Sequence, residues 1–448
     1  MTSIRSDITV VGAGVVGLAA SLRLAGAGLR VICLSRDDLS APLPGPPALD
    51  APWDKRIFAI SAASQSLLAE IGAWDQMNLQ RVGPVSSMCV FPSAGHDREP
   101  INFSADDANL PVLASIVEQS NLLAGLHLAM AGAPARLRQI RGELNAIDSP
   151  SNSEFLTLQI SDGTNIRTRL LVAADGAQSP TRALSGIGVR RVPYGQTAVV
   201  AELKTEHPHR GCAYQWFGEH GVLALLPLPD SNVALDRGSH RNSAPDLSPD
   251  SAPDLASTAV SMVWSTDPAT ARGLVNALPD QLGTDLWPIC GAVVGRCEAL
   301  GRLQTFELAS QQADTLISER VVLIGDAAHV VHPLAGQGLN LGLGDVATLG
   351  NLIAKAKSDW KRANFDPGSP LLLRRYRRHR AEPLLAMQAT IDGLQRLFAP
   401  FRGTDDVPPR RSPSPGTPAT AMRDVGWQLF ARNESLRRLL IKFAAGRA

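Results

Sequence analysis

Three glycines near the start of the chain have the spacing of a nucleotide-binding turn. Residues 8–11 form an apolar run, and Gly12, Gly14 and Gly17 follow it as GxGxxG before an Ala- and Leu-rich stretch. In a strand, turn and helix of this kind, the first glycine permits the tight turn, the second lets a pyrophosphate approach, and the third lets helix and strand pack closely. A glycine turn without a ligand is the alternative, but the context favours a dinucleotide site.

The end of the second expected strand departs from the usual dinucleotide pattern. An acidic residue normally holds the ribose hydroxyls there, whereas this chain has Ser35, followed by Arg36, Asp37 and Asp38. A hydrogen bond to a charged group contributes roughly 1.5 to 3 kcal/mol, so its loss weakens binding by about one to two powers of ten. Other contacts can still hold a dinucleotide, and Asp37 is a possible substitute for the missing acid.

Two further apolar runs also stop at glycine and aspartate. The run that begins at residue 170 stops at Asp175 and Gly176, and the run that begins at residue 321 stops at Gly325 and Asp326. Ligands of doubly wound sheets lie beyond the carboxyl ends of the strands, so we expect all three ends to face one long ligand. A carboxylate such as Asp326 suits the ribityl chain of FAD. The alternative is that Asp175 and Asp326 only cap the turns that follow them.

The segment HPLAGQGLNLGLGD, residues 332–345, places glycines between an apolar strand and a helix pattern. Gly336, Gln337 and Gly338 allow the backbone to approach a flat molecule, and we expect a helix from about Asn340 to Lys357. The start of a helix carries free N–H groups and partial positive charge, which would stabilise the negative charge of a reduced flavin.

This segment resembles, at every specified position, the HPxxGQGxNxGxxD signature of the ubiquinone-biosynthesis hydroxylases. They are a branch of the FAD-dependent aromatic monooxygenases that have the p-hydroxybenzoate hydroxylase fold. Other segments are similar to parts of the same family: DKRIFAISAASQSLLAEIGAWD (54–75), SIVEQSNLLAGL (115–126), DGAQSPTR (175–182) and the helices near the C-terminus. The resemblance therefore covers nearly the whole chain.

The resemblance implies a role for each matching residue. Gly12, Gly14 and Gly17 would hold the FAD pyrophosphate and Asp326 the ribityl chain. Pro333 and the stretch from Gly336 through Gln337 and Gly338 to Asn340 would hold the isoalloxazine. Arg56 and Gln119 would lie near the cofactor, and Asp175 and Gly176 belong to a motif linked to both FAD and the reduced nicotinamide. NAD(P)H would bind only transiently, in keeping with a single GxGxxG.

The resemblance also implies a reaction. NAD(P)H reduces the bound FAD, and one oxygen atom of O2 is transferred to an electron-rich, polyprenylated phenol in ubiquinone biosynthesis. The cofactor performs this chemistry, while the protein orients the ring and excludes water. Tyr194, Tyr214 and His332 could activate the phenol by residue type alone, so no catalytic residue is identified.

The expected architecture is α/β, with a Rossmann-like FAD-binding domain and an inserted mixed β-sheet substrate domain. The FAD-binding domain would be discontinuous, over residues 1–75, 110–183 and 296–400. The substrate-binding domain would comprise residues 76–109 and 184–295, and residues 401–448 would form a Pro-rich loop and a C-terminal helix. Strand and helix patterns alternate at the start and a strand-rich middle follows, which favours this division.

Composition limits the partners and the location. The 448 residues include 43 basic and 42 acidic ones, a net charge of +1, which argues against nucleic-acid binding. Five cysteines without a CxxC pair, and no visible signal peptide or membrane span, favour a cytoplasmic protein. An apolar stripe formed by Leu436, Leu439, Leu440, Phe443 and Ala444 could dock on the protein itself or contact the inner face of the membrane, where a polyprenyl substrate resides.

Several alternatives remain open at this stage. His329 and His332 could be read as metal ligands, but no third ligand is evident, so a turn or capping role is favoured and no metal site is predicted. The chain could be a related flavoprotein, such as a halogenase or prenyl reductase, that acts on another substrate. It could also be a non-catalytic flavin-fold subunit of an assembly of ubiquinone-biosynthesis enzymes, for which Ser35 is the sequence support.

Overall fold

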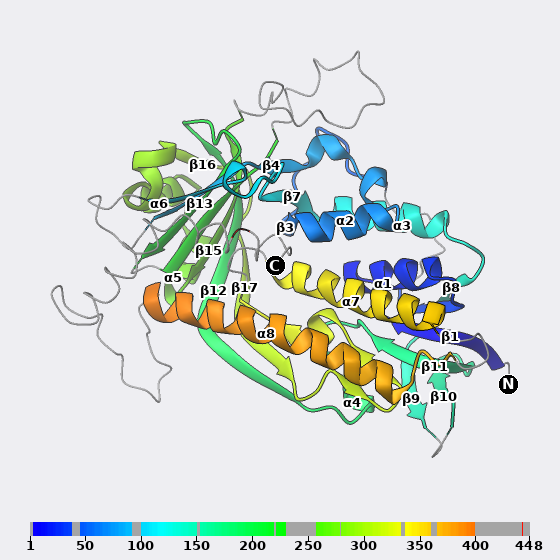
Figure 1. Ribbon diagram of the computed structural model, residues 1–448. Helices are drawn as coiled ribbons and strands as arrows, with labels where there is room; N and C mark the ends of the chain where they lie inside the picture. The colour runs from blue at the N-terminus through cyan, green and yellow to red at the C-terminus, as the bar shows by residue number, and fades with distance from the viewer. Residues whose placement is uncertain are drawn as a thin grey trace, which may run out of the picture.

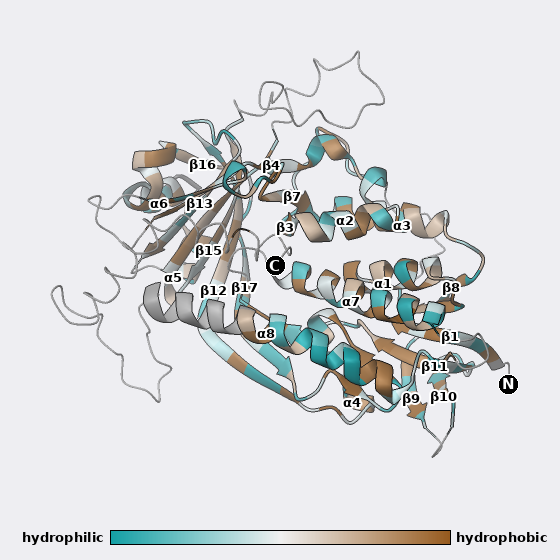
Figure 2. Ribbon diagram, viewed as in Figure 1, coloured by the Kyte–Doolittle hydropathy of each residue, from teal (hydrophilic) through white to brown (hydrophobic). Residues whose placement is uncertain are grey.

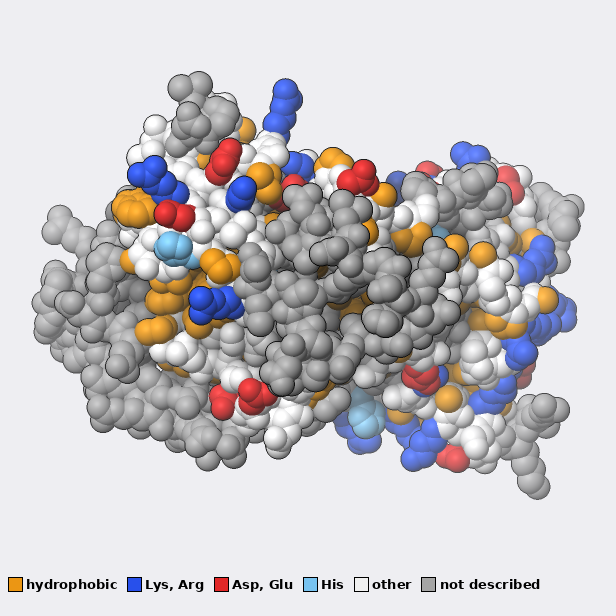
Figure 3. All heavy atoms as spheres, turned by 90° about the horizontal axis from the view of Figure 1, so that it is seen from above, with side chains coloured by type: hydrophobic (Ala, Val, Ile, Leu, Met, Phe, Trp, Pro, Cys, Tyr) orange, Lys and Arg blue, Asp and Glu red, His pale blue; other side chains and the backbone are white. Residues whose placement is uncertain are grey.

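Two large β-sheets and a small third sheet organise the protein (Figure 1). The computed structural model describes residues 3–37, 45–91, 100–149, 153–218, 221–229, 257–277, 279–332, 337–359 and 365–398, together with Ile441. Pro333 and Gly336 lie outside these residues, as does the expected C-terminal stripe. Figure 3 shows both signs of charge scattered over the described part of one face, in keeping with the near-neutral net charge.

The eight-stranded sheet has a parallel centre. Its order is β18-β19-β11-β1-β2-β8, and β10 pairs with both β11 and β9. The strands are β1 (Ser3–Val11), β2 (Val31–Ser35), β8 (Leu137–Arg141), β9 (Leu144–Asp148), β10 (Leu156–Ile160), β11 (Asn165–Ala173), β18 (Ile317–Ser318) and β19 (Val321–Leu323). All five residues of β2 are buried, as expected for a strand covered on both faces.

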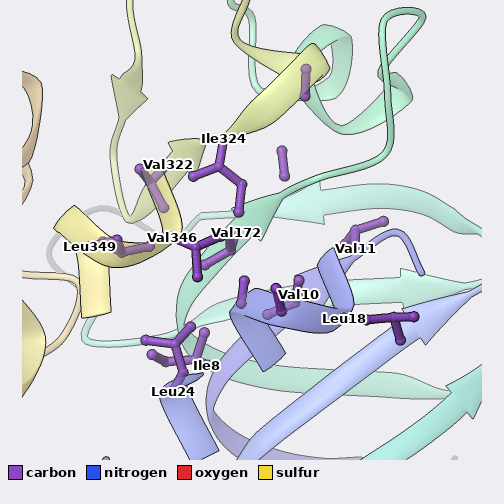
Figure 4. Close-up of a cluster of buried hydrophobic side chains, with 14 of the residues drawn as sticks. Ile8, Val10, Val11, Leu18, Leu24, Val172, Val322, Ile324, Val346 and Leu349 are labelled. Atoms are coloured by element: carbon purple, nitrogen blue, oxygen red, sulfur yellow. The ribbon is translucent and has the colours of Figure 1, made fainter. Parts of the chain in front are cut away.

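Helices cover this sheet and join it to the rest of the molecule. The helices are α1 (Val15–Gly26), α2 (Ala62–Glu70), α3 (Gln119–Ala131), α4 (Pro180–Leu184), α7 (Gln337–Asp359) and α8 (Pro370–Phe398). α1 packs against α3 and α7. Figure 4 shows part of the core between the sheet and α1 and α7, where Ile8 and Val10 of β1 lie near Leu24 of α1, Val172 of β11 and Val346 of α7.

The nine-stranded sheet is mixed. Its order is β20-β17-β12-β15-β14-β13-β5-β6, β16 pairs with β12, and the pair β13 and β5 is parallel. The strands are β5 (Ser87–Phe91), β6 (Ile101–Ser104), β12 (Val189–Thr205), β13 (Cys212–Gly218), β14 (Gly221–Pro227), β15 (Ala259–Thr266), β16 (Cys297–Ala299), β17 (Gln304–Ala313) and β20 (His329–Val330). This sheet therefore draws on residues on both sides of position 296.

The two faces of the nine-stranded sheet have different neighbours. Side chains alternate between the faces of a strand. Tyr214 and Trp216 of β13 pack in one cluster with helices α5 (Pro268–Asn276) and α6 (Pro279–Val294), and we call this the outer face. Phe217 of the same strand belongs to the core of the eight-stranded sheet, so the opposite face, the inner face, is directed toward that sheet.

A three-stranded sheet lies between the two large ones (Figure 1). Its order is β3-β7-β4, with β3 (Ile57–Ser61), β4 (Gly83–Val85) and β7 (Ala114–Glu118). Trp53, Ile57 and Ala59 pack with Ala213 and Leu226 of the inner face. Short 3-10 turns flank these strands at Trp74–Gln76, Leu79–Arg81 and Asp106–Ala108.

A buried ion pair holds the segment that leads into β3. Arg81 Nε lies 2.7 Å from Glu118 Oε2, and each side chain is 1% exposed. Arg81 also donates to the carbonyl oxygens of Ala48, Leu49 and Ala51. The pair therefore fastens a segment without regular structure and fixes where β3 begins.

The expected α/β class with a mixed second sheet is confirmed, but the length of one helix was wrong. Helix α7 runs from Gln337 to Asp359, whereas the sequence predicted Asn340 to Lys357. The chain is already helical from Gln337, so Asn340 lies within the first turn, where its side chain is bonded to β3.

The helix α8 contains the arginine-rich run of residues 374–380. In Figure 2 its first turn is hydrophobic and the following turns are hydrophilic. Within this run Tyr376 and Arg380 are buried. Ile441 is buried beside Ala105 and Leu110. None of the helices in the described ranges is long and apolar enough to cross a bilayer.

Replacing Glu118 by Gln should lower the free energy of unfolding by about 3 to 5 kcal/mol, because it leaves the buried Arg81 guanidinium without a counter-charge. Urea unfolding measures this change. The matched control is Glu307→Gln, which breaks the pair with Arg191, whose side chains are 60% and 72% exposed. The control should change stability by less than about 1 kcal/mol. If the two substitutions lower the free energy of unfolding equally, burial does not increase the contribution of the Arg81–Glu118 pair to stability.

Candidate cofactor site

Four neighbouring strands end at one edge of the eight-stranded sheet. Hydrogen bonds join their ends: Gly12 N donates to Leu34 O (2.9 Å), Ala174 N to Val11 O (2.8 Å), and Ile324 N to Ala173 O (3.0 Å). The loops that carry Gly12, Gly14 and Gly17, Ser35, Asp175 and Gly176, and Gly325 and Asp326 therefore begin side by side. The sequence predicted this convergence from the strand ends alone.

The three glycines after β1 differ in what a side chain would meet. Gly12 has φ +109°, and a Cβ there would lie 2.3 Å from Ala174 O. A Cβ on Gly17 would lie 2.0 Å from Gly12 O, whereas one on Gly14 would meet no atom of the described residues within 4 Å. Gly14 is also the N-cap of α1 and makes no side-chain cap bond, so it leaves the first N–H groups of α1 uncapped. This position could hold a pyrophosphate.

Ser35 is buried at the end of β2, and its Oγ accepts a hydrogen bond from Asp37 N at 3.1 Å. Its hydroxyl can still donate one hydrogen bond. Asp37 is exposed two residues further on. A carboxylate is therefore available close to the end of β2, although the residue at the strand end itself is neutral.

Asp175 caps the short helix that follows it. Its Oδ1 accepts a hydrogen bond from Ser179 Oγ, and its Oδ2 accepts one from Thr181 N at 2.9 Å. Arg182 in that helix donates to Ala327 O (2.9 Å) and so ties this loop to the loop after β19. The capping role was the alternative for Asp175, and it accounts for both carboxylate oxygens. Gly176 has φ +87° and open space around its Cβ position.

Asp326 differs from Asp175 because its carboxylate makes no hydrogen bond to the described part of the chain. The side chain is exposed, yet the surrounding protein desolvates it and raises its pKa, against the opposing charges of His329 and Arg56. The carboxylate oxygens are therefore free to accept hydrogen bonds from the hydroxyl groups of a ligand. A ribityl chain has the hydroxyls for this role.

A fully buried carboxylate, Asp345, holds the loop that presents Asp326. It accepts hydrogen bonds from Gly325 N (2.8 Å), His329 Nε2 (2.7 Å) and Arg380 Nε (2.5 Å). Burial would raise the pKa of Asp345, but the charges and hydrogen bonds of these groups outweigh burial and lower it. α7, α8 and the turn Gly325–Ala327 are thereby joined through one side chain.

The first turn of α7 lies against β3. Asn340 Nδ2 donates to Ala59 O (2.7 Å), and Asn340 Oδ1 accepts from Ser61 N (2.9 Å). Gln337 and Gly338 precede Asn340 in the same helix, and the one described atom within 4 Å of a Cβ on Gly338 would be Val331 Cγ2, at 3.9 Å. The described residues thus leave room beside Gly338.

Arg56 and Gln119, which the family resemblance would place near the cofactor, are neighbours in the structure. Arg56 Nη1 donates to Gln119 Oε1 at 3.3 Å, and the guanidinium lies 5.8 Å from the ring of Phe306 in β17. Arg56 is exposed and acts electrostatically on Asp326. A positive charge therefore adjoins the carboxylate that could hold the cofactor.

The three residues considered for phenol activation do not lie together. Tyr194 and His332 form an edge-to-face pair with ring centroids 4.8 Å apart, and His332 Nε2 lies 3.1 Å from Gln196 Oε1. Burial lowers the pKa of His332 to about 4, so the ring is neutral at neutral pH. Tyr214 lies on the outer face of the sheet. Within the described ranges no group of three or more His, Cys, Asp or Glu could hold a metal ion.

Sequence reasoning missed the buried groups whose hydrogen bonds hold the loops of the site in place. Asp345 stands at the last fixed position of the HPxxGQGxNxGxxD signature, which was a signal for it, and Arg182 stands at the last position of DGAQSPTR. Arg380 had no such signal. It is one of several arginines in a run, and nothing in the sequence distinguishes it from the others. Among the arginines of α8 whose side chains are described, it is the one that is buried.

Comparisons with known proteins agree with this geometry. The profile of the family described as FAD binding domain matches residues 5–383. The ubiquinone hydroxylase UbiL of Rhodospirillum rubrum is 30% identical, with coverage of 98% of this chain and 90% of UbiL. The 3-demethoxyubiquinol 3-hydroxylase of Escherichia coli is 30% identical over the full length of both chains. The crystal structure of p-nitrophenol 4-monooxygenase PnpA from Pseudomonas putida superimposes with a TM-score of 0.68 at 18% identity, covering 100% of both chains, and shows a common fold.

Replacing Asp326 by Ala should weaken FAD binding by about ten- to a hundredfold, because a charge-assisted hydrogen bond contributes roughly 1.5 to 3 kcal/mol. Fluorescence titration of the protein freed of cofactor measures the dissociation constant. Asp285→Asn in the outer helix α6 is the control and should leave FAD affinity unchanged. Unchanged affinity in Asp326→Ala would exclude this carboxylate from the cofactor site.

Replacing Asp345 by Asn should lower the free energy of unfolding by about 3 to 5 kcal/mol at neutral pH, because the buried charges of its partners lose their counter-charge. The folded-state pKa of Asp345 lies below its ordinary value of 3.8, so its contribution is complete above about pH 4 and is lost as the pH falls below that value. Urea unfolding between pH 7 and pH 3 should show the difference from the wild type shrink in acid.

Asp359→Asn, at the exposed end of the same helix, is the control and should match the wild type at every pH. A difference between wild type and Asp345→Asn that stays constant down to pH 3 would contradict the assigned role of the Asp345 charge.

Proposed function

Because this chain belongs to the family of FAD-dependent monooxygenases, we propose that it hydroxylates the aromatic ring of a polyprenylated phenol in ubiquinone biosynthesis. NAD(P)H would be the reductant and O2 the oxygen donor. The observation that carries the proposal is the 30% identity to two ubiquinone hydroxylases along essentially the whole chain. That similarity includes all three sheets, and thus both the cofactor edge and the face that would meet the substrate.

The residues of the site fit FAD. The open position at Gly14 and the N-terminus of α1 would hold the pyrophosphate, and the unbonded Asp326 carboxylate would hold the ribityl hydroxyls. Gln337, Gly338 and Asn340 lie in the first turn of α7, which would meet the isoalloxazine with its partial positive charge. Bound FAD supplies the electron and oxygen transfer. The charge of Arg56 would favour negative charge that develops nearby.

The remaining task of the protein is to orient the ring and exclude water. The inner face of the nine-stranded sheet suits this task, because it combines apolar side chains with few polar ones and faces the cofactor-binding sheet. His332 is neutral and held by Gln196, so it presents no competing charge next to the site.

Deleting the gene and measuring the mass of the accumulated quinone precursor tests the proposal. The precursor should lack one oxygen atom that the wild-type product contains, and the purified protein should be yellow. It should oxidise NAD(P)H and add one atom of isotopically labelled oxygen to a prenylated phenol. A colourless protein that binds no added FAD would support a non-catalytic subunit instead. NAD(P)H oxidation without hydroxylation of any phenol would support a flavoprotein with another substrate.

A further inference from the structure

Gln215 of β13 is a buried polar residue on the inner face whose amide has no hydrogen-bond partner in the described chain. The side chain is 5% exposed. Its neighbours on either side, Tyr214 and Trp216, belong to the outer cluster, so alternation along the strand directs Gln215 toward the cofactor-binding sheet. A buried amide without a partner lowers stability unless something else supplies the bond.

The cross-strand partners of Gln215 are apolar. Gln215 is paired with Ala224 of β14, Ala224 with Val263 of β15, and Val263 with Val200 of β12. We call these four residues the middle row. Gln215 is its one polar member, so an apolar molecule that lay across the row would meet a single hydrogen-bonding group.

The middle row lies between two rows that are packed against the rest of the protein. On one side, Phe217 and Val222 belong to the core of the eight-stranded sheet. On the other side, Leu226 packs with Trp53 and Ile57. Ala224 and Val263, by contrast, are partly exposed and belong to none of the four hydrophobic clusters in the described residues. The inner face is therefore open to contact at this row.

The amide of Gln215 can be reached from this opening. Two other polar groups of the inner face, Glu202 Oε1 and Ser261 Oγ, are sealed from solvent without a hydrogen-bond partner. The two amide atoms of Gln215 also lack partners but are not sealed, so each keeps some contact with solvent. Gln215 thus offers a donor and an acceptor to a small molecule that enters beside it.

The middle row is also close to the residues around the cofactor edge. Ala198 lies two residues from Val200 along β12 and is paired with Phe306. The ring of Phe306 lies 5.8 Å from the Arg56 guanidinium, whose charge acts on Asp326. A ring over Ala224 and Val263 would therefore lie on the same face of the sheet as Phe306, two strands away from β17.

We propose that the Gln215 amide binds the hydroxyl group of the substrate phenol while the ring lies over Ala224 and Val263, which makes Gln215 a specificity-determining residue. Small-molecule sites commonly combine an apolar lining with few polar groups that fix orientation. An amide can accept the phenol O–H or donate to the phenol oxygen. This inference rests on the proposed function, because it assumes that the substrate is a phenol.

The test compares two ligands on the FAD-loaded protein by titration calorimetry: ortho-prenylphenol and prenylbenzene, which lacks the hydroxyl. Gln215→Leu should weaken binding of ortho-prenylphenol about three- to tenfold, which is the contribution of one neutral hydrogen bond. It should leave the dissociation constant of prenylbenzene within about twofold of the wild-type value. The two ligands and two proteins form a double-mutant cycle that isolates the bond between amide and hydroxyl. Tyr214→Phe, the adjacent residue on the outer face, is the matched control and should change neither affinity.

Equal weakening for both ligands, or no weakening for either, would overturn the inference. A fall in the melting temperature of Gln215→Leu below that of Tyr214→Phe, without ligand, would also overturn it, since the amide would then have an internal partner. If the wild type binds neither ligand, the proposed function fails together with this inference. If the wild type binds and hydroxylates ortho-prenylphenol but the cycle shows no coupling, only the role of Gln215 fails.

Discussion

The buried charge of Asp345 is the constraint on which the cofactor edge depends. A carboxylate without water is stable only when nearby groups compensate its charge, and here the amide of Gly325, the ring of His329 and the guanidinium of Arg380 do so. These partners come from the segment after β19, which includes β20, and from α8, while Asp345 itself belongs to α7. Satisfying one charge therefore fixes three segments relative to one another. Asp326 adjoins Gly325, so its position follows from that arrangement.

Residues of the same type have opposite roles depending on whether the fold provides partners. Asp175 and Asp326 both follow strands of the same sheet, but the first has both oxygens bonded within its own loop, and the second accepts no hydrogen bond from the described residues. Arg81 is sealed against Glu118, whereas Arg56 remains exposed beside Gln119. The sealed groups hold loops in place, whereas the Asp326 carboxylate and the exposed Arg56 guanidinium can still meet a ligand. A charged group that the protein itself does not satisfy is the better indicator of a binding role.

In the nine-stranded sheet, the face on which a side chain lies determines its neighbours. Strand alternation sends Tyr214 to the outer helices and Gln215 to the inner face, although the two residues are adjacent. The aromatic residue that looked suited to chemistry by type thus lies on the face turned away from the cofactor-binding sheet, and an amide without any motif lies on the face turned toward it. The face on which a residue lies decides which of the two could meet a substrate.

Local patterns in the sequence were sufficient for the parts of this protein that depend on neighbours along the chain. Apolar runs that stop at glycine and aspartate predicted the strand ends, and GxGxxG predicted a turn in which Gly12 and Gly17 have no room for a side chain. The extent of α7, the burial of Arg380 and the placement of Gln215 were decided only by tertiary structure. Each depends on a partner far away in the sequence, such as β3 for Asn340 or α7 for Arg380, and no local pattern encodes which distant groups will share a buried space.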